Sequence, residues 1–303
     1  MKDKARAMVL ASFVGDALAL GPHWIYETDR IEKEFGRVEN LCSPLADSYH
    51  PGKGKGDFTH YGDQALVLMK SVAANRGFVL DDFSRRWQDF FADYDGYVDS
   101  ATKETLENFA KGAGPQNSGA NSSDLGGVAR IAALAYRYRD DSDGMLTAVH
   151  AQTAMTHAAS ASLAGADFLS RTLFFILQGA SPQEAIEEAL GAGVADMALD
   201  MRLAVALDSA GKDSRQTIAR FGQMCTIVSA LPGVVHLVLT YGDDLRTALI
   251  ENVMAGGDSA ARGMVTGMIL GASLGLDAIP GEWLQEMTRY DEIIALLAEL
   301  EDQ

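Results

Sequence analysis

Small and helix-favouring residues constrain the fold of this chain more than any other feature of its sequence. Glycines recur every four residues, at Gly263, Gly267 and Gly271, within a predicted helix over 261–276. Because glycine has no side chain, such a helix can be packed closely against its neighbours. Alanine, leucine, methionine and glutamate are common along the chain, whereas the alternation typical of strands is scarce. The sequence therefore predicts an all-α fold.

Apolar residues at helical spacing, together with helix-end signals, predict most of the other helices. The run Ser181-Pro182-Gln183-Glu184 is typical of a helix start, with serine at the N-cap and glutamate at the third helical position. No repeat or interdomain linker interrupts the pattern, so we expect a single domain over 1–303, a compact multi-helix bundle. The expected helices cover 3–20, 81–94, 98–111, 125–139, 145–155, 158–178, 215–230, 243–254, 261–276 and 282–300.

Charge excludes some classes of partner. The formal net charge is −17, whereas proteins that bind nucleic-acid phosphates or anionic membranes carry a basic face. The uncharged stretch over 225–242 contains Pro232-Gly233 and is interpreted as two buried helix ends, not as a membrane span. Cys42 and Cys225 show no metal-binding or redox spacing, and the first residues lack the pattern of a signal peptide. We therefore expect a cytoplasmic protein with no nucleic-acid or membrane partner.

Two aspartates stand at unusual positions: one could bind a ligand or accept a proton, and the other places a charge inside an apolar helix. Asp258 follows the Gly256-Gly257 turn at the mouth of the helix over 261–276. The helix dipole favours a negative charge there, and the carboxylate could be an oxygen ligand or a proton acceptor. Asp16 lies inside an apolar first helix, where its charge needs an ion pair, a cation or hydrogen bonds. A structural and a functional role are both open for Asp16.

Polar residues also crowd the start of a helix near residue 60. His60, Tyr61, Asp63 and Gln64 precede the apolar run over 65–69. As an N-cap, Asp63 would contribute about 1 kcal/mol without any function, but the crowding favours a site. The preceding Gly-Lys-Gly-Lys-Gly run over 52–56 could cradle a phosphate. Because it lacks the spacing of known phosphate loops, a flexible solvated loop is the favoured interpretation.

Two further segments carry polar residues that could bind a ligand. The loop over 117–130 supplies amides and hydroxyls with Asp124 and Arg130, which could hydrogen-bond a sugar or a base; an ordinary connector is the alternative. Thr156-His157 precedes the helix over 158–178, where a threonine N-cap beside a structural histidine is the commoner arrangement. The other histidines show no metal-ligand spacing; they are His23, His50, His150 and His236.

The order of these motifs along the chain is distinctive. It runs through Gly15-Asp16-Ala17-Leu18, Tyr61-Gly62-Asp63-Gln64, Arg130 after a glycine-rich loop, Thr156-His157 with Leu163-Ala164-Gly165, Gly256-Gly257-Asp258, and Leu276, Ile279-Pro280 and Trp283-Leu284. Together the motifs resemble the ADP-ribosylglycohydrolase family, which includes the dinitrogenase-reductase-activating glycohydrolases and the J1 crystallins. The resemblance covers nearly the whole chain and is most specific in its carboxyl-terminal block.

The resemblance implies an orthogonal all-α bundle with a central cleft and a metal-dependent glycosidase. In that family two divalent cations, magnesium or manganese, hold the ribose hydroxyls and activate the water that cuts the N- or O-glycosidic bond of ADP-ribose. The ligands come from an early Thr-Asp-Asp triplet and a late Asp-x-Asp-Thr element. Here Gly62-Asp63-Gln64 and Asp258-Ser259-Ala260-Ala261 stand in their place, so Asp63 and Asp258 are kept and their partners are not.

Weak metal binding is the expected consequence of these replacements. Two divalent cations repel each other and need several carboxylates around them, and an amide is a poor substitute for a carboxylate as a ligand of Mg²⁺. We therefore expect no binuclear centre. Either no metal is bound, or one Mg²⁺ or Mn²⁺ is held weakly by Asp63 and Asp258.

Two main functions follow from the sequence. The first is a divergent hydrolase of N- or O-linked ADP-ribose, or of a related ribosyl or nucleotide glycoside, on a small-molecule or ADP-ribosylated substrate. Its catalytic residues would be Asp63 and Asp258, with Asp16 assisting. The expected substrate-binding residues are His60, Tyr61, Gln64, Asn121, Asp124, Gly126, Arg130, His157 and Ser259.

The second function is an inactive family member that binds a ligand or has a structural role. Loss of ligands at both motifs favours it. A helical scaffold with incidental polar loops is a third interpretation, which the cost of keeping carboxylates inside helices disfavours. The sequence leaves the oligomeric state open.

Overall fold

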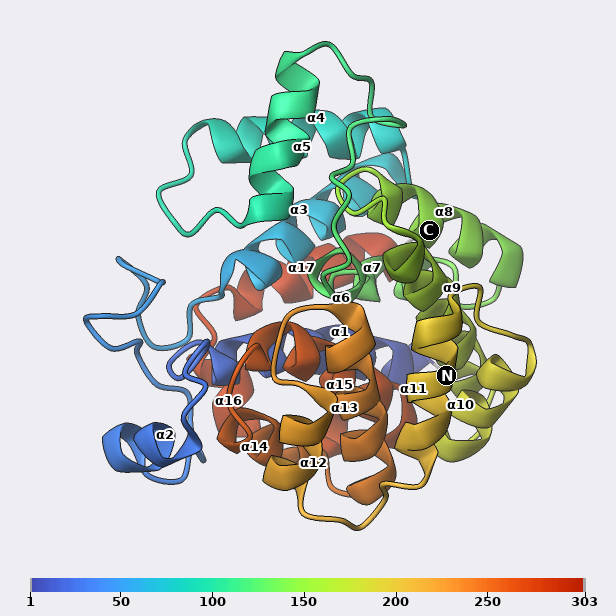
Figure 1. Ribbon diagram of the computed structural model, residues 1–303. Coiled ribbons are helices and arrows are strands. Elements are labelled where there is room, and N and C mark those ends of the chain that lie inside the picture. Colours follow the sequence, from blue (N-terminus) through green and yellow to red (C-terminus); the bar gives the residue numbers. More distant parts are fainter. Residues whose placement is uncertain (1, 302–303) are drawn as a thin grey trace.

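Two antiparallel helices, α1 (Lys2–Ala19) and α15 (Ser259–Leu274), pack along their length at the centre of the fold (Figure 1). The computed structural model describes residues 2–301. A Cβ atom at Gly267 of α15 would lie 2.2 Å from the carbonyl oxygen of Ala11, and one at Gly15 of α1 would lie 2.3 Å from that of Gly263. The two backbones are therefore closer than side chains would allow, which explains the glycine repeat in α15.

The other helices surround this pair, and the all-α prediction is confirmed. Their bounds are α2 (Thr28–Phe35), α3 (His60–Asn75), α4 (Leu80–Ala92), α5 (Ser100–Ala110), α6 (Gly126–Ala129), α7 (Ala132–Arg137), α8 (Ser142–Ala154), α9 (Ser160–Leu177), α10 (Pro182–Gly191), α11 (Met197–Leu207), α12 (Ser214–Phe221), α13 (Ile227–Thr240), α14 (Leu245–Met254), η1 (Leu276–Ala278), α16 (Gly281–Glu286) and α17 (Tyr290–Glu301). Over residues 2–301, extended backbone pairs only in two isolated bridges, Ala120–His157 and Asp124–Thr226.

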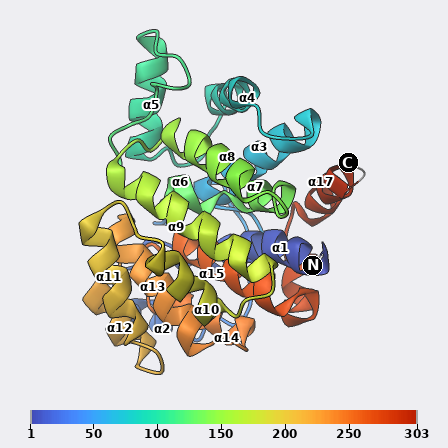
Figure 2. The ribbon, with the colours of Figure 1, turned by 90° about the vertical axis from the view of Figure 1, so that its right-hand side faces the viewer.

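The central pair separates two groups of helices. α3, α4 and α5 lie on one side of it, and α10 to α14 lie on the other, in both views (Figures 1 and 2). The first and last described helices, α1 and α17, are joined by the ion pairs of Lys2 and Arg6 with Glu301, at 3.1 and 2.9 Å. The predicted capping box at Ser181 is confirmed at the start of α10.

Some helix boundaries differ from the prediction. The single helix expected over 125–139 is two short helices, α6 and α7, because the chain turns at Arg130. The helix expected over 215–230 ends at Gly222, which has a φ of 102°. The helix expected over 282–300 is interrupted where the amide of Thr288 donates to the carbonyl of Gly56. α2 and α11 are additional to the predicted helices.

The prediction that Pro232-Gly233 divides the stretch over 225–242 into two helix ends is wrong. α13 runs through Pro232 without a break. A proline removes one backbone N–H, but α13 packs against α11, α12 and α15, and tertiary packing supplies most of a helix's stability.

One described helix, α9, is long and apolar enough to cross a membrane by length and composition alone. In the fold, 67% of this segment is buried, and α9 packs against α8 and α10. Its apolar character is therefore accounted for by its place in the helical core.

The close contact between α1 and α15 can be tested with Gly267→Ala. The added methyl group would collide with the carbonyl of Ala11, so we expect the free energy of unfolding to fall by about 1–3 kcal/mol or more in urea titrations. Gly281→Ala is the matched control, because no other segment of the chain lies within 4 Å of the place that its Cβ atom would take, and the residue is also helical. Equal stability of the two variants would contradict the packing argument.

Candidate functional site

Asp258 is the N-cap residue of α15, at the helix mouth where the sequence places it. Its Oδ1 accepts the amide of Ala261 at 3.3 Å, and both glycines of the Gly256-Gly257 turn have a φ of 71°. Its Oδ2 accepts the hydroxyl of Tyr61 at 2.8 Å. Burial raises the pKa of the Asp258 carboxyl group, and the hydrogen bond from Tyr61 opposes this effect only in part. The helix mouth therefore holds a buried carboxyl group whose pKa is raised above its usual value.

Tyr61 connects Asp258 to a buried contact between His60 and Asp99. The ring centroids of His60 and Tyr61 are 3.9 Å apart, and a Cβ atom at Gly126 would lie 2.5 Å from the Tyr61 ring. His60 Nε2 lies 3.2 Å from Asp99 Oδ2. Burial raises the pKa of Asp99, but its contacts with His60 outweigh this and hold the pKa below its usual range. Asp99 is thus a buried carboxylate within the candidate site.

Three histidines from separate segments stack beside Tyr61. The ring centroids of His23 and His50 are 5.2 Å apart, and those of His50 and His60 are 6.2 Å apart. His23 Nδ1 accepts the amide of Ala260 at 3.4 Å, which assigns the proton of the neutral ring to Nε2. Burial lowers the pKa of His50 to about 3 and that of His23 well below its usual value, so both rings are neutral. The sequence spacing of these histidines shows no sign of this cluster.

Trp24 covers the histidine cluster. Its ring stacks on that of His23 at 4.5 Å and meets that of Tyr97 edge-on at 4.6 Å. Its φ is 64°, a left-handed conformation that a bulky residue rarely adopts. The amide of Trp24 donates to the carbonyl of Gly257 at 3.0 Å, which ties this strained residue to the turn before Asp258. Strain of this kind concentrates at functional sites.

Arg130 is buried and held by neutral acceptors. Its Nε donates to Gln152 Oε1 at 2.9 Å and its Nη1 to Gln64 Oε1 at 2.8 Å, and its Nη2 donates to Thr156 Oγ1. His157 Nδ1 lies 2.8 Å from the same hydroxyl oxygen. Burial lowers the pKa of Arg130 to about 10, so the guanidinium stays charged at neutral pH. Gln64, Arg130 and His157, which are all expected substrate-binding residues, thus lie together, and each has an internal partner.

Asp16 holds the start of α3. Its Oδ2 accepts the amide of Thr59 at 2.7 Å, and its Oδ1 accepts the hydroxyl of the same residue at 2.6 Å. Burial raises the pKa of Asp16 to about 6, although both hydrogen bonds from Thr59 lower it. A Cβ atom at Gly62 would lie 2.5 Å from Asp16 Oδ2. The carboxyl group of Asp16 therefore occupies the space that a larger residue at position 62 would need.

Asp63 forms an ion pair with Lys53. Lys53 Nζ lies 2.6 Å from Asp63 Oδ2, and the hydroxyl of Tyr94 donates to the same oxygen at 2.8 Å. Both charged side chains are shielded, with 19% and 18% of their surface exposed. Lys55, from the same loop, pairs with Glu286 at 2.7 Å. Lys53 is therefore shielded, whereas Lys55 lies at the surface, and each lysine is paired with a carboxylate of the chain.

The predicted helix cap at Thr156 is wrong, and the alternative N-cap role of Asp63 is not adopted either. α3 begins at His60, and Thr59 is its N-cap, so Asp63 lies in the first turn. α9 begins at Ser160 after Ala159, so Thr156 is not its cap. In both cases tertiary contacts, rather than the helix backbone, hold the polar side chain.

The remaining predicted residues lie around this network. Ser259 is buried, and its hydroxyl has no hydrogen-bond partner among the described residues. Asp124 lies beside the thiol of Cys225, and burial raises the pKa of its carboxyl group. Asn121 is exposed and donates its backbone amide to Glu104, which leaves its side chain outside the buried cluster.

Tyr94 and Asp99 are site residues that the sequence patterns do not indicate, and Lys53 is indicated only as part of the run over 52–56. Asp99 has a local signal, because it is the N-cap of α5 and accepts the amide of Thr102 at 2.6 Å. Nothing local connects Lys53 or Tyr94 with Asp63. They meet Asp63 from 10 and 31 residues away in sequence, so only the folded chain brings the three together.

This donor set does not fit two divalent cations. Asp63 Oδ2 already binds an ammonium group and a hydroxyl group, and Gln64 Oε1 accepts from Trp87 Nε1 at 2.8 Å as well as from Arg130. Ala260 contributes no side-chain oxygen. Over residues 2–301, no group of three or more His, Cys, Asp or Glu side chains is arranged to hold a metal ion. Too few negative oxygens are therefore left to offset the repulsion between two cations.

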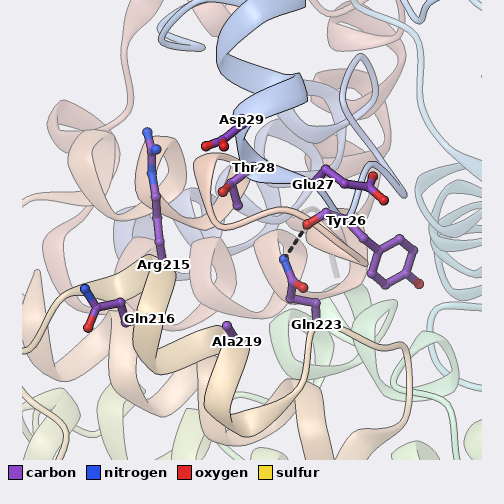
Figure 3. Close-up of a pocket in the computed structure, with 8 residues that line it drawn as sticks. All are labelled: Tyr26, Glu27, Thr28, Asp29, Arg215, Gln216, Ala219 and Gln223. Atoms are coloured by element: carbon purple, nitrogen blue, oxygen red, sulfur yellow. Dashed lines mark hydrogen bonds between the residues drawn. The ribbon is translucent and has the colours of Figure 1, made fainter.

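A cavity of about 400 Å³ lies beside the turn that precedes Asp258, between the start of α2 and α12 (Figure 3). Gln223 Nε2 donates to the carbonyl of Tyr26 at 3.0 Å within this cavity, and the carbonyl of Gln223 accepts the amide of Asp258 at 2.8 Å. Gln223 thus links the cavity to the candidate site. The residues that line it are Tyr26, Glu27, Thr28, Asp29, Arg215, Gln216, Ala219 and Gln223.

Comparisons with known proteins support the resemblance found in the sequence. The family model described as ADP-ribosylglycohydrolase matches residues 1–303. Crystallin J1A of Tripedalia cystophora is 24% identical over 99% of this chain and 96% of its own length. ADP-ribosylhydrolase ARH3 of Homo sapiens is 25% identical over 80% of this chain and 78% of its own length. A solved structure described as an ADP-ribosylglycohydrolase-related protein complex aligns with a TM-score of 0.79 at 25% identity, over 99% of this chain and 98% of that one.

Asp16→Asn tests the raised pKa of Asp16. The folded protein holds the Asp16 proton more tightly than the unfolded chain, so ionisation of Asp16 lowers the free energy of unfolding as pH rises from about 4 to about 6. Asparagine keeps an oxygen for the Thr59 amide and cannot ionise. We therefore expect the variant to gain stability relative to the wild type over this window, up to about 3 kcal/mol at pH 7. A stability difference that does not change with pH in denaturant titrations would contradict this account.

Proposed function

The chain belongs to the ADP-ribosylglycohydrolase family, and we propose that it hydrolyses an N- or O-linked ADP-ribose, or a related ribosyl or nucleotide glycoside, without a binuclear metal centre. Family membership supports the substrate class. The contacts of Asp63, Gln64 and Asp258 described above support a mechanism that does not use a binuclear metal centre.

Buried polar atoms without hydrogen-bond partners around Asp258 carry the proposal. They include His23 Nε2, Ser259 Oγ and Arg262 Nη1, none of which binds another described residue. His23 Nδ1 lies 3.9 Å from Asp258 Oδ1, and Ser259 and Arg262 follow Asp258 in α15. Each unsatisfied buried group costs about 1–3 kcal/mol. The hydroxyl groups of a ligand such as ribose are the kind of partner that these atoms lack.

We assign Asp258 and Asp63 the roles of acid and base. Burial raises the pKa of Asp258, and in this proposal its carboxyl group gives a proton to the leaving oxygen or nitrogen. Lys53 and Tyr94 hold Oδ2 of Asp63 in place, and Asp63 takes a proton from the water that attacks the anomeric carbon. Asp16 contacts Thr59 through both oxygens, and we assign it a positioning role rather than a catalytic one.

Lys53 supplies a positive charge where relatives with the full motifs would place a cation. Its ammonium group is 2.6 Å from Asp63 and most of its surface is shielded. A shielded ion pair is screened little by salt and is stronger than an exposed one. In this proposal Lys53 balances the charge of Asp63 and orients it, so the site does not depend on a bound ion.

One observation favours a second candidate, a non-catalytic binding or structural protein. The side chains of Asp258 and His23 have no exposed surface in this conformation. An active enzyme would have to move the segment around Trp24 to admit a substrate. Crystallin J1A, to which the chain is similar over 99% of its length, is named as a crystallin and not as a hydrolase.

Hydrolysis of a panel of ADP-ribosyl, ribosyl and nucleotide glycosides distinguishes the two candidates. We expect product release, measured by chromatography, that EDTA does not abolish and that Mg²⁺ or Mn²⁺ does not increase. Asp258→Asn cannot donate a proton in the same way and should lower kcat by about 10²–10⁴-fold. Tight binding of a panel member with no turnover would support the second candidate, and turnover that requires a divalent cation would refute the metal-independent mechanism.

Lys53→Met tests the internal ammonium group. Its loss leaves Asp63 without a counter-charge, and we expect kcat to fall by about tenfold or more, equivalent to at least about 1.4 kcal/mol of barrier. Added Mn²⁺ should restore part of the lost activity, because a cation can then approach Asp63. Lys55→Met is the matched control on the same loop, since Lys55 pairs with Glu286 at the surface. If both variants behave alike, Lys53 has no special role.

A further inference from the structure

The exposed face of α11 is apolar from end to end. Met197, Met201 and Val205 are spaced four residues apart and have 79%, 63% and 61% of their surface exposed. Ala198 and Ala204 are exposed on the same side. These five residues define the α11 face. A helix on a protein surface normally turns charged residues towards water, so an apolar face of this length indicates a binding surface.

Opposite charges border the two edges of the α11 face. Residues advance by about 100° around a helix, so Asp200 and Arg202 lie on opposite sides of Met201. Arg202 also lines a cavity of about 330 Å³, together with two further basic residues, Lys212 and Arg220. One edge of the face therefore carries an acidic residue and the other a basic one, and Arg202 Nη2 also donates to the carbonyl of Phe221.

We propose that the α11 face joins two copies of this chain, with the two α11 helices side by side and parallel about a two-fold axis. That symmetry brings the Asp200 edge of each copy to the Arg202 edge of the other. An antiparallel pair would instead bring Asp200 near Asp200 and Arg202 near Arg202, and like charges in contact are repulsive. The charges on the two edges therefore favour a second copy of this chain as the partner, with its α11 helix parallel to the first.

The charge of the whole chain also favours this face as the contact between copies. With a net charge of −17, two copies repel each other over most of their surfaces. The α11 face carries no charge apart from Asp208, the exposed C-cap residue at its carboxyl end, and its two borders carry charges of opposite sign. α11 also lies at the periphery of the helical array, where a second copy can reach it (Figure 2).

The size of the face predicts a dimer of moderate affinity. Stable interfaces bury about 800 Å² on each partner, and a single helix of 11 residues spans only about 16 Å. The methionine side chains can adapt to each other at the contact. We therefore expect a dissociation constant in the micromolar range.

Sedimentation velocity of the full chain tests the proposal. The wild type should shift from monomer to dimer between about 1 and 100 µM, and Val205→Glu should remain monomeric across that range. Val79→Glu is the matched control, because Val79 is also an exposed valine, 43% exposed at the start of α4, and this variant should dimerise like the wild type. Circular dichroism checks that both variants are folded. A monomeric wild type at 100 µM, or equal dimerisation of the two variants, would overturn the proposal.

Cross-linking tests the orientation. In the parallel pair Met197 faces Met197 of the other copy, so Met197→Cys should form a disulfide-linked dimer under mild oxidation. The unaltered chain, whose Cys42 and Cys225 are partly buried, is the control and should form far less. An antiparallel pair would place residue 197 opposite residue 205. A Met197→Cys protein that cross-links only to a Val205→Cys protein would therefore contradict the parallel arrangement.

Discussion

The close contact between α1 and α15 is the constraint on which the rest of the structure depends. Gly15 faces Gly263, and Ala11 faces Gly267, at distances that leave no room for a side chain. This antiparallel register brings the end of α1 to the start of α15. His23, which follows α1, is thereby placed 3.9 Å from Asp258. A change that separated these two helices would therefore disturb the candidate site as well as the core.

The positive charges in the candidate site come from side chains of the protein itself. Lys53 lies against Asp63, where the family resemblance would place a divalent cation. Arg130 is held by two amide oxygens and a hydroxyl, and Arg262 by the side chain and carbonyl of Asn252 and the carbonyl of Gly256. Burial lowers the pKa of both guanidinium groups to about 10, so they remain cations. Lys53 beside Asp63 and Arg262 near Asp258 thus supply a positive charge at each aspartate, which lessens the electrostatic need for a metal ion.

Local signals made part of this structure predictable. The N-cap position of Asp258, the capping box at Ser181 and the glycine repeat of α15 depend on a few neighbouring residues, and the sequence shows them directly. The contacts of Asp63 were not predictable in this way, because Lys53 and Tyr94 reach it through the tertiary fold. The same holds for the stack of His23, His50 and His60, whose members come from three separate segments. Thr59, and not Asp63, is the N-cap of α3, and the side chain of Asp63 instead binds Lys53 and Tyr94.

The central claim is that an ammonium group of the chain, and not a metal ion, neutralises Asp63. Crystals soaked in Mn²⁺ and measured at the manganese absorption edge test it most directly, because anomalous scattering locates the metal without reference to activity. The account predicts no anomalous peak between Asp63 and Asp258, and electron density for Lys53 Nζ in contact with Asp63 Oδ2. Two anomalous peaks at that position, with Lys53 displaced from Asp63, would contradict it.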